Sequence, residues 1–258
     1  MARLWSAIGF ILMSAAAQAQ DSSSVVAGFL QTLMVEMDLA RAYRDYADPN
    51  FIEHNPEIGN GLAAKIAYFA ERQARNPNAA GPASWVNVID HVIVSGDLFS
   101  VHRHVFMTAA DPGRVFVDIW RVAGGKIVEH WDIIQAVQSG PPGRPGSTTL
   151  WCGPGSDYAA ARALPETLHE PSCGAADPRA NGKASVALVR DHIHMPGTIV
   201  RILVQGNLVL LHRHVTRQGD EGESVAADIF RVDGRRIAEH WEVSEAVPPK
   251  TVSGNTVW

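Results

Sequence analysis

Several features that would place this chain in a specialised class are missing from its sequence. The 258 residues include only two cysteines, which excludes a disulfide-rich scaffold and a cysteine-based zinc site. No apolar run approaches the roughly 18 residues that a membrane-spanning helix requires, so no membrane span is expected. The 22 Lys and Arg residues are balanced by 27 Asp and Glu residues, so nothing indicates a nucleic-acid partner. A small molecule is therefore the expected partner.

The N-terminus has the pattern of an export signal. A basic residue precedes an apolar run over residues 4–13, and Ala17-Gln18-Ala19 is a small-x-small cleavage sequence. We therefore expect residues 1–19 to be a signal peptide and the mature protein to be secreted or periplasmic. In an oxidising compartment Cys152 and Cys173 are candidates for a disulfide, and two free thiols are the alternative.

The strongest positive feature of the sequence is an internal repeat. Residues 92–137 and 202–247 align without a gap at an offset of 110, and 19 of the 46 aligned positions are identical. The identities include polar residues that hydrophobic patterning alone would not preserve, such as His102-Arg103-His104, Asp118 and Glu129-His130-Trp131. The repeat therefore predicts two domains, each with a related polar cluster.

The hydrophobic periodicity predicts helices followed by an antiparallel sheet in each half, which is an α+β fold. In the first half we expect helices over residues 25–37, 38–46 and 61–73 and strands over 85–94, 98–107, 115–122 and 127–137. In the second half we expect short helices over 157–163 and 186–191 and strands over 199–204, 208–215, 224–232 and 237–247. The second copy thus keeps its sheet, but its helical part is reduced.

Domain boundaries follow from the repeat and from composition. The segment over residues 139–156 is rich in proline and glycine at its start, which is typical of a linker. We therefore assign the first domain to residues 20–138, a degenerate second domain to 157–248 and a C-terminal tail to 249–258. The two copies could pack sheet to sheet within one chain as a pseudo-dimer, and a homodimer is also open.

Polar residues at alternate strand positions predict a site on one face of each sheet. Residues of equal parity share a face of a strand. With turns near Asp111 and at Gly124-Gly125, one concave surface of the first sheet should carry four polar side chains: His104, Asp118, His130 and Asp132. The second copy repeats them as His214, Asp228, His240 and Glu242. Phe116 and Trp120 share this face, which favours a lined pocket, although the solvated side of a half-exposed sheet would give the same pattern.

Several motifs, taken in order along the chain, resemble one known family. They are Phe51-Ile52-Glu53-His54-Asn55-Pro56, Gly59-Asn60-Gly61 at the start of a helix, and residues 117–122 continuing through residues 125–132. Together they resemble the SnoaL-like polyketide cyclases of the nuclear transport factor 2-like superfamily, which also contains ketosteroid isomerase. The resemblance covers residues 24–137, and the second copy has only Leu168-His169-Glu170-Pro171 as a loose counterpart of the His54 motif.

The resemblance implies two tandem cone-shaped domains, with three helices closing a curved antiparallel sheet around a pocket in the first. It implies that Asp132 is the acid/base, that Asp118 occupies a position often held by histidine in the family, and that His54 contributes from the helix side. The other residues expected to line the substrate pocket are Asn55, His102, Phe116, Trp120, Tyr68 and Phe69.

A carboxylate in an apolar cavity is suited to take a proton from a carbon next to a carbonyl group, because desolvation raises its pKa. We expect Asp132 to act as this base, while His104, His130 or a protonated Asp118 stabilises the enolate oxygen. The sequence thus predicts an exported protein that binds a small apolar carbonyl compound and catalyses cyclase or isomerase chemistry without a cofactor. We expect the first copy to be the working site, because the His54 motif is clear only there.

Two other classes of function stay open. Export and a duplicated pocket also suit a binding or assembly module without turnover. A metal site is the other alternative, because His102, His104, Asp118 and His130 offer imidazole and carboxylate ligands. Gly96 followed by five residues and His-x-His resembles the start of a cupin motif, but the glutamate and the second motif of that fold are missing.

Overall fold

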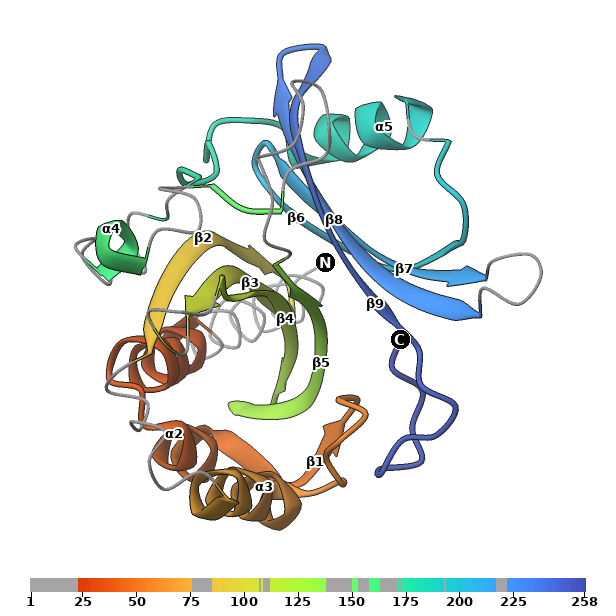
Figure 1. Cartoon of the computed structure of the whole chain (residues 1–258). Helices are drawn as coiled ribbons and strands as arrows, with labels where there is room; N and C mark the ends of the chain where they lie inside the picture. Colours follow the sequence, from red (N-terminus) through yellow and green to blue (C-terminus); the bar gives the residue numbers. More distant parts are fainter. Residues whose placement is uncertain are drawn as a thin grey trace, which may run out of the picture.

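The computed structural model describes residues 23–75, 85–106, 108, 112–137, 150–152, 158–162, 171, 173–192, 194–216 and 222–258. The expected signal peptide and most of the expected linker lie outside the described residues. The described part of the chain has an α+β fold with two sheets, as the sequence predicts (Figure 1). None of its described helices is long and apolar enough to cross a membrane.

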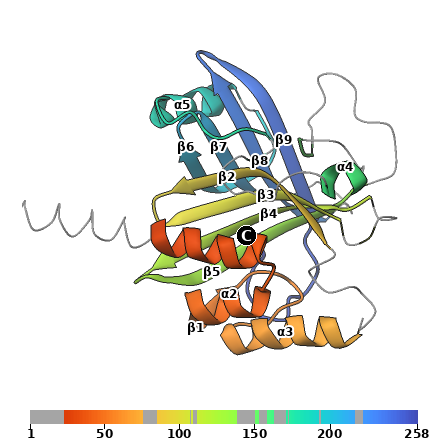
Figure 2. The same ribbon diagram turned by 90° about the vertical axis from the view of Figure 1, so that its left-hand side faces the viewer.

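Helices cover the concave side of the first sheet (Figures 1 and 2). A helix over residues 23–30 continues as the π-helix η1 (Gln31–Val35), and α2 (Leu39–Tyr46) and α3 (Leu62–Arg75) follow. Asp38 caps α2, because its side chain accepts a hydrogen bond from the Arg41 backbone N–H at 3.0 Å. Phe29 and Tyr43 of these helices join Trp120 of the sheet in one buried core.

The first sheet has five strands in the order β1-β5-β4-β3-β2. They are β1 (Ala47–Glu53), β2 (Val86–Ser95), β3 (Leu98–Phe106), β4 (Arg114–Ala123) and β5 (Lys126–Ala136). Strand β1 was not expected from the sequence, because Pro49 interrupts it. It pairs parallel with β5 at the edge of the sheet, where a strand tolerates a proline. The sheet curves, so its concave face turns toward the helices (Figure 1).

The second sheet has four antiparallel strands in the order β6-β7-β8-β9. They are β6 (Thr198–Gln205), β7 (Leu208–Thr216), β8 (Glu223–Asp233) and β9 (Arg236–Ala246), and α5 (Gly182–His192) packs on them. The short helix α4 (Tyr158–Arg162) was expected to belong to the second domain. It packs on β2 of the first domain instead, where Ala161 shares a buried cluster with Val86 and Phe106.

A disulfide fixes the segment between the two sheets. Cys152 and Cys173 are bonded, with their Cα atoms 5.3 Å apart, as the sequence predicts for an oxidising compartment. Both residues also contact Asp90 of β2. The Cys152 N–H donates to the Asp90 carboxylate at 3.3 Å, and the Cys173 N–H donates to the Asp90 carbonyl at 3.1 Å. The disulfide therefore holds this segment against the first sheet.

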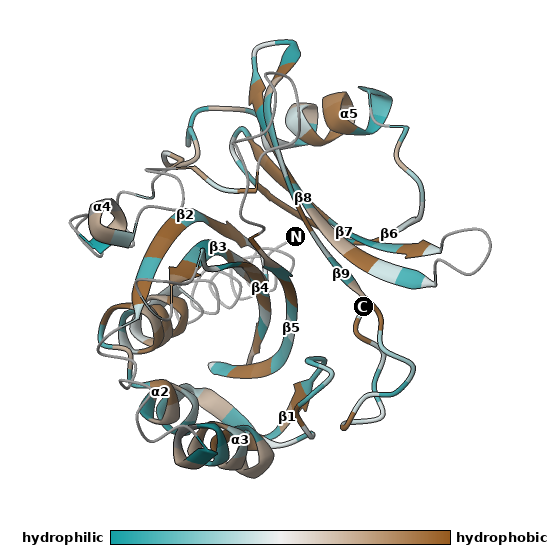
Figure 3. Cartoon of the chain, viewed as in Figure 1, coloured by the Kyte–Doolittle hydropathy of each residue, from teal (hydrophilic) through white to brown (hydrophobic). Residues whose placement is uncertain are grey.

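The two sheets pack against each other within one chain. Hydrophobic residues run along the strands of both sheets (Figure 3). The faces that meet form one buried core. Its members include three pairs of residues that are equivalent at the offset of 110: Val117 and Ala227, Ile119 and Ile229, Trp131 and Trp241. The same face of each copy is therefore buried, as in a dimer with twofold symmetry.

The hydrogen bonds between the two sheets come in equivalent pairs, and in each pair the copy that donates in one bond accepts in the other. The backbone N–H groups of two strand ends in each copy donate to side chains of the other copy. The pairs are Val94 with Gln205 and Val204 with Ser95, and Ile134 with Glu245 and Ser244 with Gln135, at 2.8 to 3.0 Å. Each pair maps onto its partner at the offset of 110, so the tandem copies are arranged as a pseudo-twofold dimer.

The C-terminal tail of the second domain returns to the first domain (Figure 1). The Val252 N–H donates to the Pro56 carbonyl at 2.9 Å, and the Asn255 side-chain amide donates to the Glu53 carbonyl at 2.9 Å. Val257 is buried in the core between the sheets. The tail therefore braces the loop between β1 and α3 of the first domain, which carries residues of the site.

Candidate active site

The pairing of β4 with β5 places the predicted acids on the concave face of the first sheet. Asp118 lies directly opposite Asp132, and Trp120 lies opposite His130. Asp118, His130 and Asp132 therefore share one face of the sheet, as the sequence predicts. The register is offset by two residues from a direct Asp118–His130 pair. The two-residue turn accounts for one residue of this offset, and the bulge between Arg121 and Val122 accounts for the other.

The predicted position of His104 on this face is wrong. In the pairing of β3 with β4, Arg103 lies opposite Phe116 and His104 opposite Val115, so Arg103 occupies the concave face. The sequence-based pairing assumed a turn near Asp111 that matched His104 with Asp118. A connection of several residues can set either parity, and a shift of one residue moves every side chain to the other face.

His102 and His104 lie on the face that meets the second domain. His102 Nε2 donates to the Leu150 carbonyl at 2.7 Å, and its Nδ1 lies 3.0 Å from His91 Nδ1. Burial lowers the pKa of His102 to about 4, so the ring is neutral and accepts from His91. His104 Nε2 donates to the Pro112 carbonyl at 3.0 Å. Both rings therefore contact the segment that follows the first sheet, His102 through Leu150 and His104 through Trp151.

His54 also lies outside the cavity. Its Nδ1 donates to the Thr256 carbonyl of the C-terminal tail, and its Nε2 lies 2.9 Å from Glu129 Oε1. Its ring stacks on Trp131, with centroids 4.8 Å apart. His54 therefore joins the tail to the outer face of the first sheet, and the residue that follows it, Asn55, points into the cavity instead.

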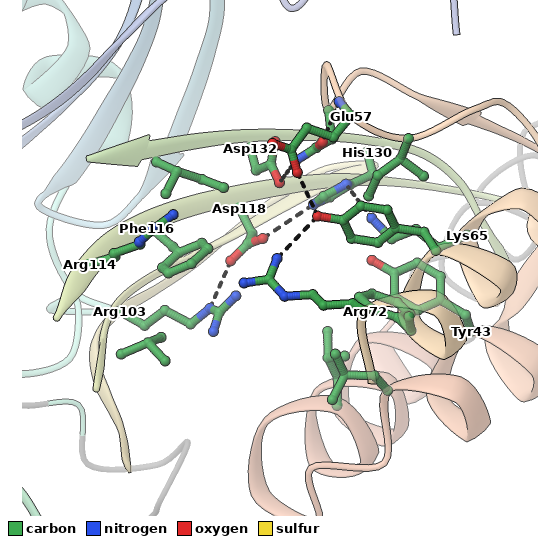
Figure 4. A pocket seen from close by; sticks show the side chains of 18 of the residues that line it. Tyr43, Glu57, Lys65, Arg72, Arg103, Arg114, Phe116, Asp118, His130 and Asp132 are labelled. Carbon is green, nitrogen blue, oxygen red and sulfur yellow. Dashed lines mark hydrogen bonds and ion pairs between the residues drawn. The ribbon is translucent and has the colours of Figure 1, made fainter. Parts of the chain in front are cut away.

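A cavity of about 340 Å³ lies between the concave face and the helices (Figure 4). Of the residues predicted for the site, those that line it are Asn55, Tyr68, Phe69, Phe116, Asp118, Trp120, His130 and Asp132. Further apolar walls come from the helices and strand ends: Leu33, Met34, Met37, Leu39, Ile58, Trp85 and Val105. The cavity therefore has the mixed lining of a small-molecule site, largely apolar with a few polar groups.

A buried ionic network that the sequence did not reveal underlies the cavity wall. Lys65 Nζ on α3 lies 2.6 Å from Glu53 Oε2 on β1. His130 Nδ1 donates to Glu53 Oε1 at 2.8 Å, and its Nε2 donates to Asp118 Oδ1 at 3.2 Å. Asp118 Oδ2 accepts from Arg103 Nε at 2.8 Å. Positive and negative groups therefore alternate along five side chains, all but Arg103 almost fully buried.

The network fixes the charge of each member. Burial acts to raise the pKa of Glu53, but Lys65 and His130 outweigh it and lower that pKa to about 2. Burial likewise acts to raise the pKa of Asp118, but Arg103 and His130 lower it to about 2. For His130, burial and Lys65 act to lower the pKa, but Glu53 and Asp118 raise it to about 9. His130 is therefore an imidazolium at neutral pH.

Asp132 is set apart from this network. Its Oδ2 accepts a hydrogen bond from Asn55 Nδ2 at 2.7 Å. Its Oδ1 is buried and has no hydrogen-bond partner among the described residues. Burial raises the pKa of Asp132, and the attraction of His130 only partly opposes this shift. Of the two acids that face each other on β4 and β5, Asp132 is therefore the one whose pKa lies above its ordinary value.

Tyr43 supplies a neutral hydroxyl to the same cavity (Figure 4). Its oxygen accepts a hydrogen bond from Trp120 Nε1 at 3.3 Å, which leaves its own proton to donate. Burial raises the pKa of Tyr43, so the phenol stays protonated. Tyr43 was missed in the sequence because a helical tyrosine among apolar residues is ordinarily a packing residue.

The cavity rim carries a smaller polar group. Tyr68 donates its hydroxyl proton to Glu57 Oε2 at 2.8 Å and accepts from Arg72 Nη1 at 3.1 Å (Figure 4). These side chains come from α3 and from the loop after β1; Glu57 and Arg72 are exposed and Tyr68 is half-buried. They form a polar edge around the apolar interior, which favours a ligand with one polar end at the entrance.

The second copy retains only part of this arrangement. Asp228 Oδ2 accepts from Arg213 Nε at 2.6 Å, and Asp228 Oδ1 lies 2.8 Å from His240 Nε2. Arg213 also lies 3.5 Å from Glu242. The position that corresponds to Lys65 on the helix is Val186, so the lysine is replaced and α5 covers this face with apolar contacts. His214 lies on the opposite face and stacks on Trp258.

The predicted metal ligands do not converge, since His102 and His104 lie on the other face of the sheet from Asp118 and His130. A different group, Asp118, His130 and Asp132, has ligand atoms within 4.8 Å of one another. Both ring nitrogens of His130 already donate to carboxylates, so neither has a lone pair for a metal. This group is therefore better suited to proton chemistry than to a cation.

Comparisons with known proteins agree with the resemblance seen in the motifs. No protein-family model matches the chain, and no curated protein is significantly similar to it. Among solved structures, the chain is similar to IdmH, a proposed polyketide cyclase from Streptomyces antibioticus, at 20% identity over 44% of this chain and 91% of that one, with a TM-score of 0.32. It is also similar to a proposed SnoaL-like polyketide cyclase from Jannaschia sp. CCS1, at 19% identity over 48% and 95% of the two chains, with a TM-score of 0.36.

A third similar structure is a proposed ketosteroid isomerase from Kribbella flavida DSM 17836. It is 17% identical over 49% of this chain and 86% of that one, with a TM-score of 0.36. Solved structures similar to this chain thus include SnoaL-like and ketosteroid isomerase-like proteins, each of which spans about half of it. Similarity at these values carries no argument about activity, which has to come from the site itself.

Proposed function

We propose that the first domain binds a small, largely apolar carbonyl compound and that Asp132 takes a proton from the carbon next to the carbonyl group. One observation carries this proposal: Asp132 borders the cavity with one oxygen held by Asn55 and the other, Oδ1, buried without a partner. A carboxylate held in one orientation with a free oxygen is the geometry of a general base. Cyclase and isomerase reactions both begin with this step.

The transfer of this proton leaves a negative charge on the substrate, and other residues of the cavity have to stabilise it. As the C–H bond breaks, its proton passes to Asp132 Oδ1 and its electron pair forms the enolate, whose negative charge lies on the former carbonyl oxygen. The hydroxyl of Tyr43 is a neutral donor in the cavity whose proton can stabilise this oxygen. Asp118 cannot donate a proton because it is ionised, and His130 donates both of its protons to carboxylates.

The charged network supports this role indirectly. It places the positive charges of His130 and Lys65 beneath the cavity, where they limit the rise in the pKa of Asp132 that burial causes. The carboxylates of Glu53 and Asp118 in the same network act in the opposite direction, and the net result is a pKa above the ordinary aspartate value.

The test is exchange of α-protons in deuterated buffer with a panel of small cyclic and aromatic ketones. Wild-type protein should incorporate deuterium into at least one ketone, and Asp132→Asn should lower the rate by about 100-fold or more. Glu242→Gln is the matched control in the second copy and should keep the wild-type rate. Binding of a ketone without exchange in the wild type would sink the proposal and leave a binding protein.

We also propose that the protein is exported. The cleavage pattern at residues 17–19 and the Cys152–Cys173 disulfide support this location. Expression of the whole chain with cell fractionation and N-terminal sequencing is the test. A mature N-terminus at Gln20 outside the cytoplasm is the expected result, and an intact N-terminus in the cytoplasm with free thiols would contradict it.

A further inference from the structure

The cavity of the first domain includes one residue of the second. Glu245 lies on β9 and lines the cavity together with Ile134 and Asp132 of β5. Glu245 Oε2 accepts a hydrogen bond from the Ile134 N–H at 2.9 Å. Ile134 and Asp132 are two positions apart on one strand, so their side chains share the face that borders the cavity. A carboxyl of the second copy is therefore part of the first copy's pocket.

The contact between the domains does not require a charge at this position. The residue equivalent to Glu245 at the offset of 110 is Gln135, and its Oε1 accepts a hydrogen bond from the Ser244 N–H at 2.8 Å. A neutral amide thus makes the same interdomain hydrogen bond on the other side of the pseudo-twofold axis. Glu245 differs from Gln135 because it can ionise. Glu245 is also the one of the two that lines the cavity.

We propose that Glu245 is a positioning residue of the first-copy site, which acts from the second domain by controlling how readily Asp132 ionises. This inference rests on the proposed role of Asp132 as the base. It gives the second copy a direct part in the reaction, because the copy in which Val186 replaces the lysine supplies a carboxyl to the copy that has Lys65.

The groups that surround Glu245 support this coupling. Burial raises the pKa of Glu245, and the hydrogen bond from Ile134 acts in the opposite direction. Asp132 and Glu57 raise the pKa further and Arg114 lowers it, with the result that the group titrates at about 7. Two carboxyls that share a cavity release their protons in two steps that belong to the pair. A proton on Glu245 therefore removes a negative charge near Asp132 and makes ionisation of Asp132 easier.

The first test is the pH profile of α-proton exchange in the intact chain. In the wild type, the loss of two coupled protons should broaden the acid limb of the profile. In Glu245→Gln this limb should become a single step, with its midpoint lowered by about 0.5 to 1 pH unit, because the neighbouring negative charge is gone. The substituted amide can still accept the Ile134 N–H, as Gln135 does in the equivalent contact, so a purely structural role would leave the profile unchanged.

Gln135→Glu is the matched control. It places a carboxyl at the equivalent position on β5, on the face of the strand opposite to that of Asp132, and should leave the profile as in the wild type. An unchanged profile in Glu245→Gln, with a melting temperature equal to that of the wild type, would overturn the inference. So would an equal shift in Gln135→Glu.

A second measurement separates this inference from the proposed function. The amide of Ile134 donates to Glu245, so its chemical shift should report the titration of Glu245 in the absence of any ligand. The shift should show a transition near pH 7 in the wild type, none in Glu245→Gln, and one at lower pH in Asp132→Asn. If this pattern holds but no ketone exchanges, the base role fails and the coupling stands. If Asp132→Asn abolishes exchange but leaves the Ile134 transition in place, the coupling is wrong and the base role stands.

Discussion

Asp118 and Asp132 face each other across two neighbouring strands, yet the structure drives their pKa values in opposite directions. Asp118 is held by Arg103 and by the His130 imidazolium, so its pKa falls to about 2 despite its burial. Asp132 is held only by the Asn55 amide, and burial raises its pKa. The two carboxyls thus have contrasting environments in one cavity, with the pKa of Asp118 lowered and that of Asp132 raised, the pattern that we propose separates a fixed charge from a base.

Asp118→Asn should lower the pKa of His130, because the substitution removes one of the two carboxylates that stabilise the imidazolium. A proton NMR titration of the His130 ring should show its pKa move down from about 9 by about one unit or more. Asp97→Asn is the control, since Asp97 forms an exposed ion pair with Arg121 far from the network. A His130 titration that is the same in Asp118→Asn and in the wild type would contradict the network.

The stability of the protein should fall as the pH rises from 6.5 to 9. The folded-state pKa of His130 is raised to about 9 from its ordinary value of 6.5, so its contribution is complete below pH 6.5 and is lost as pH rises through 9. The decline in the free energy of unfolding should amount to roughly 3 kcal/mol in urea titrations. His130→Gln should flatten the curve over this range, whereas His240→Gln, the matched change in the second copy, should keep the decline.

Lys65→Met should destabilise the protein strongly, because it leaves the buried Glu53 carboxylate with one fewer positive partner. Lys65 and Glu53 are both almost fully inaccessible to solvent, and breaking such a pair costs about 3 to 5 kcal/mol. Urea unfolding of Arg75→Met is the comparison, since the ion pair of Arg75 with Glu71 is exposed and should contribute less than about 1 kcal/mol. Equal losses in the free energy of unfolding in Lys65→Met and Arg75→Met would show that the removal of Lys65 does not leave a costly unpaired charge in the protein interior.

Cys152→Ser with Cys173→Ser should lower the free energy of unfolding by about 3 kcal/mol, because the bond closes a loop with a sequence separation of 21 residues. The same loss should appear when the wild type is unfolded under reducing conditions. Oxidised wild-type protein that is no more stable than the double variant would show that the segment is held by its contacts with Asp90 alone.

The regular elements of the fold could be predicted because their periodicity is local. The eight strands of the repeat and the helices α2, α3 and α5 lie within a few residues of their predicted bounds. Strand β1 could not be predicted in this way. Its polar residues and Pro49 do not alternate as a half-buried strand does, and it forms only because β5 offers it an edge.

The site was predictable where it depended on one strand pair and unpredictable where it depended on distant segments. The sequence predicts the shared face of Asp118, His130 and Asp132, but the two-residue turn between β4 and β5 does not set it alone. That turn pairs Ala123 with Lys126, and the one-residue shift between Arg121 and Val122 then brings Asp118 opposite Asp132. The face of His104 depended on a longer connection, and the partners of Lys65 and Glu53 depended on how a helix crosses the sheet. Arg103 did carry a signal, since it is identical in both copies and lies between two histidines.

Of the two facing acids Asp118 and Asp132, we propose that Asp132 is the one that binds and releases a proton. The most direct measurement is a carbon-13 NMR titration of the aspartate side-chain carboxyls, assigned with Asp132→Asn and Asp118→Asn. We predict that Asp132 titrates above the ordinary aspartate value of 3.8 and that Asp118 remains ionised down to a pH of about 2. An Asp132 that titrates at or below 3.8, or an Asp118 that titrates above it, would contradict this assignment of the base.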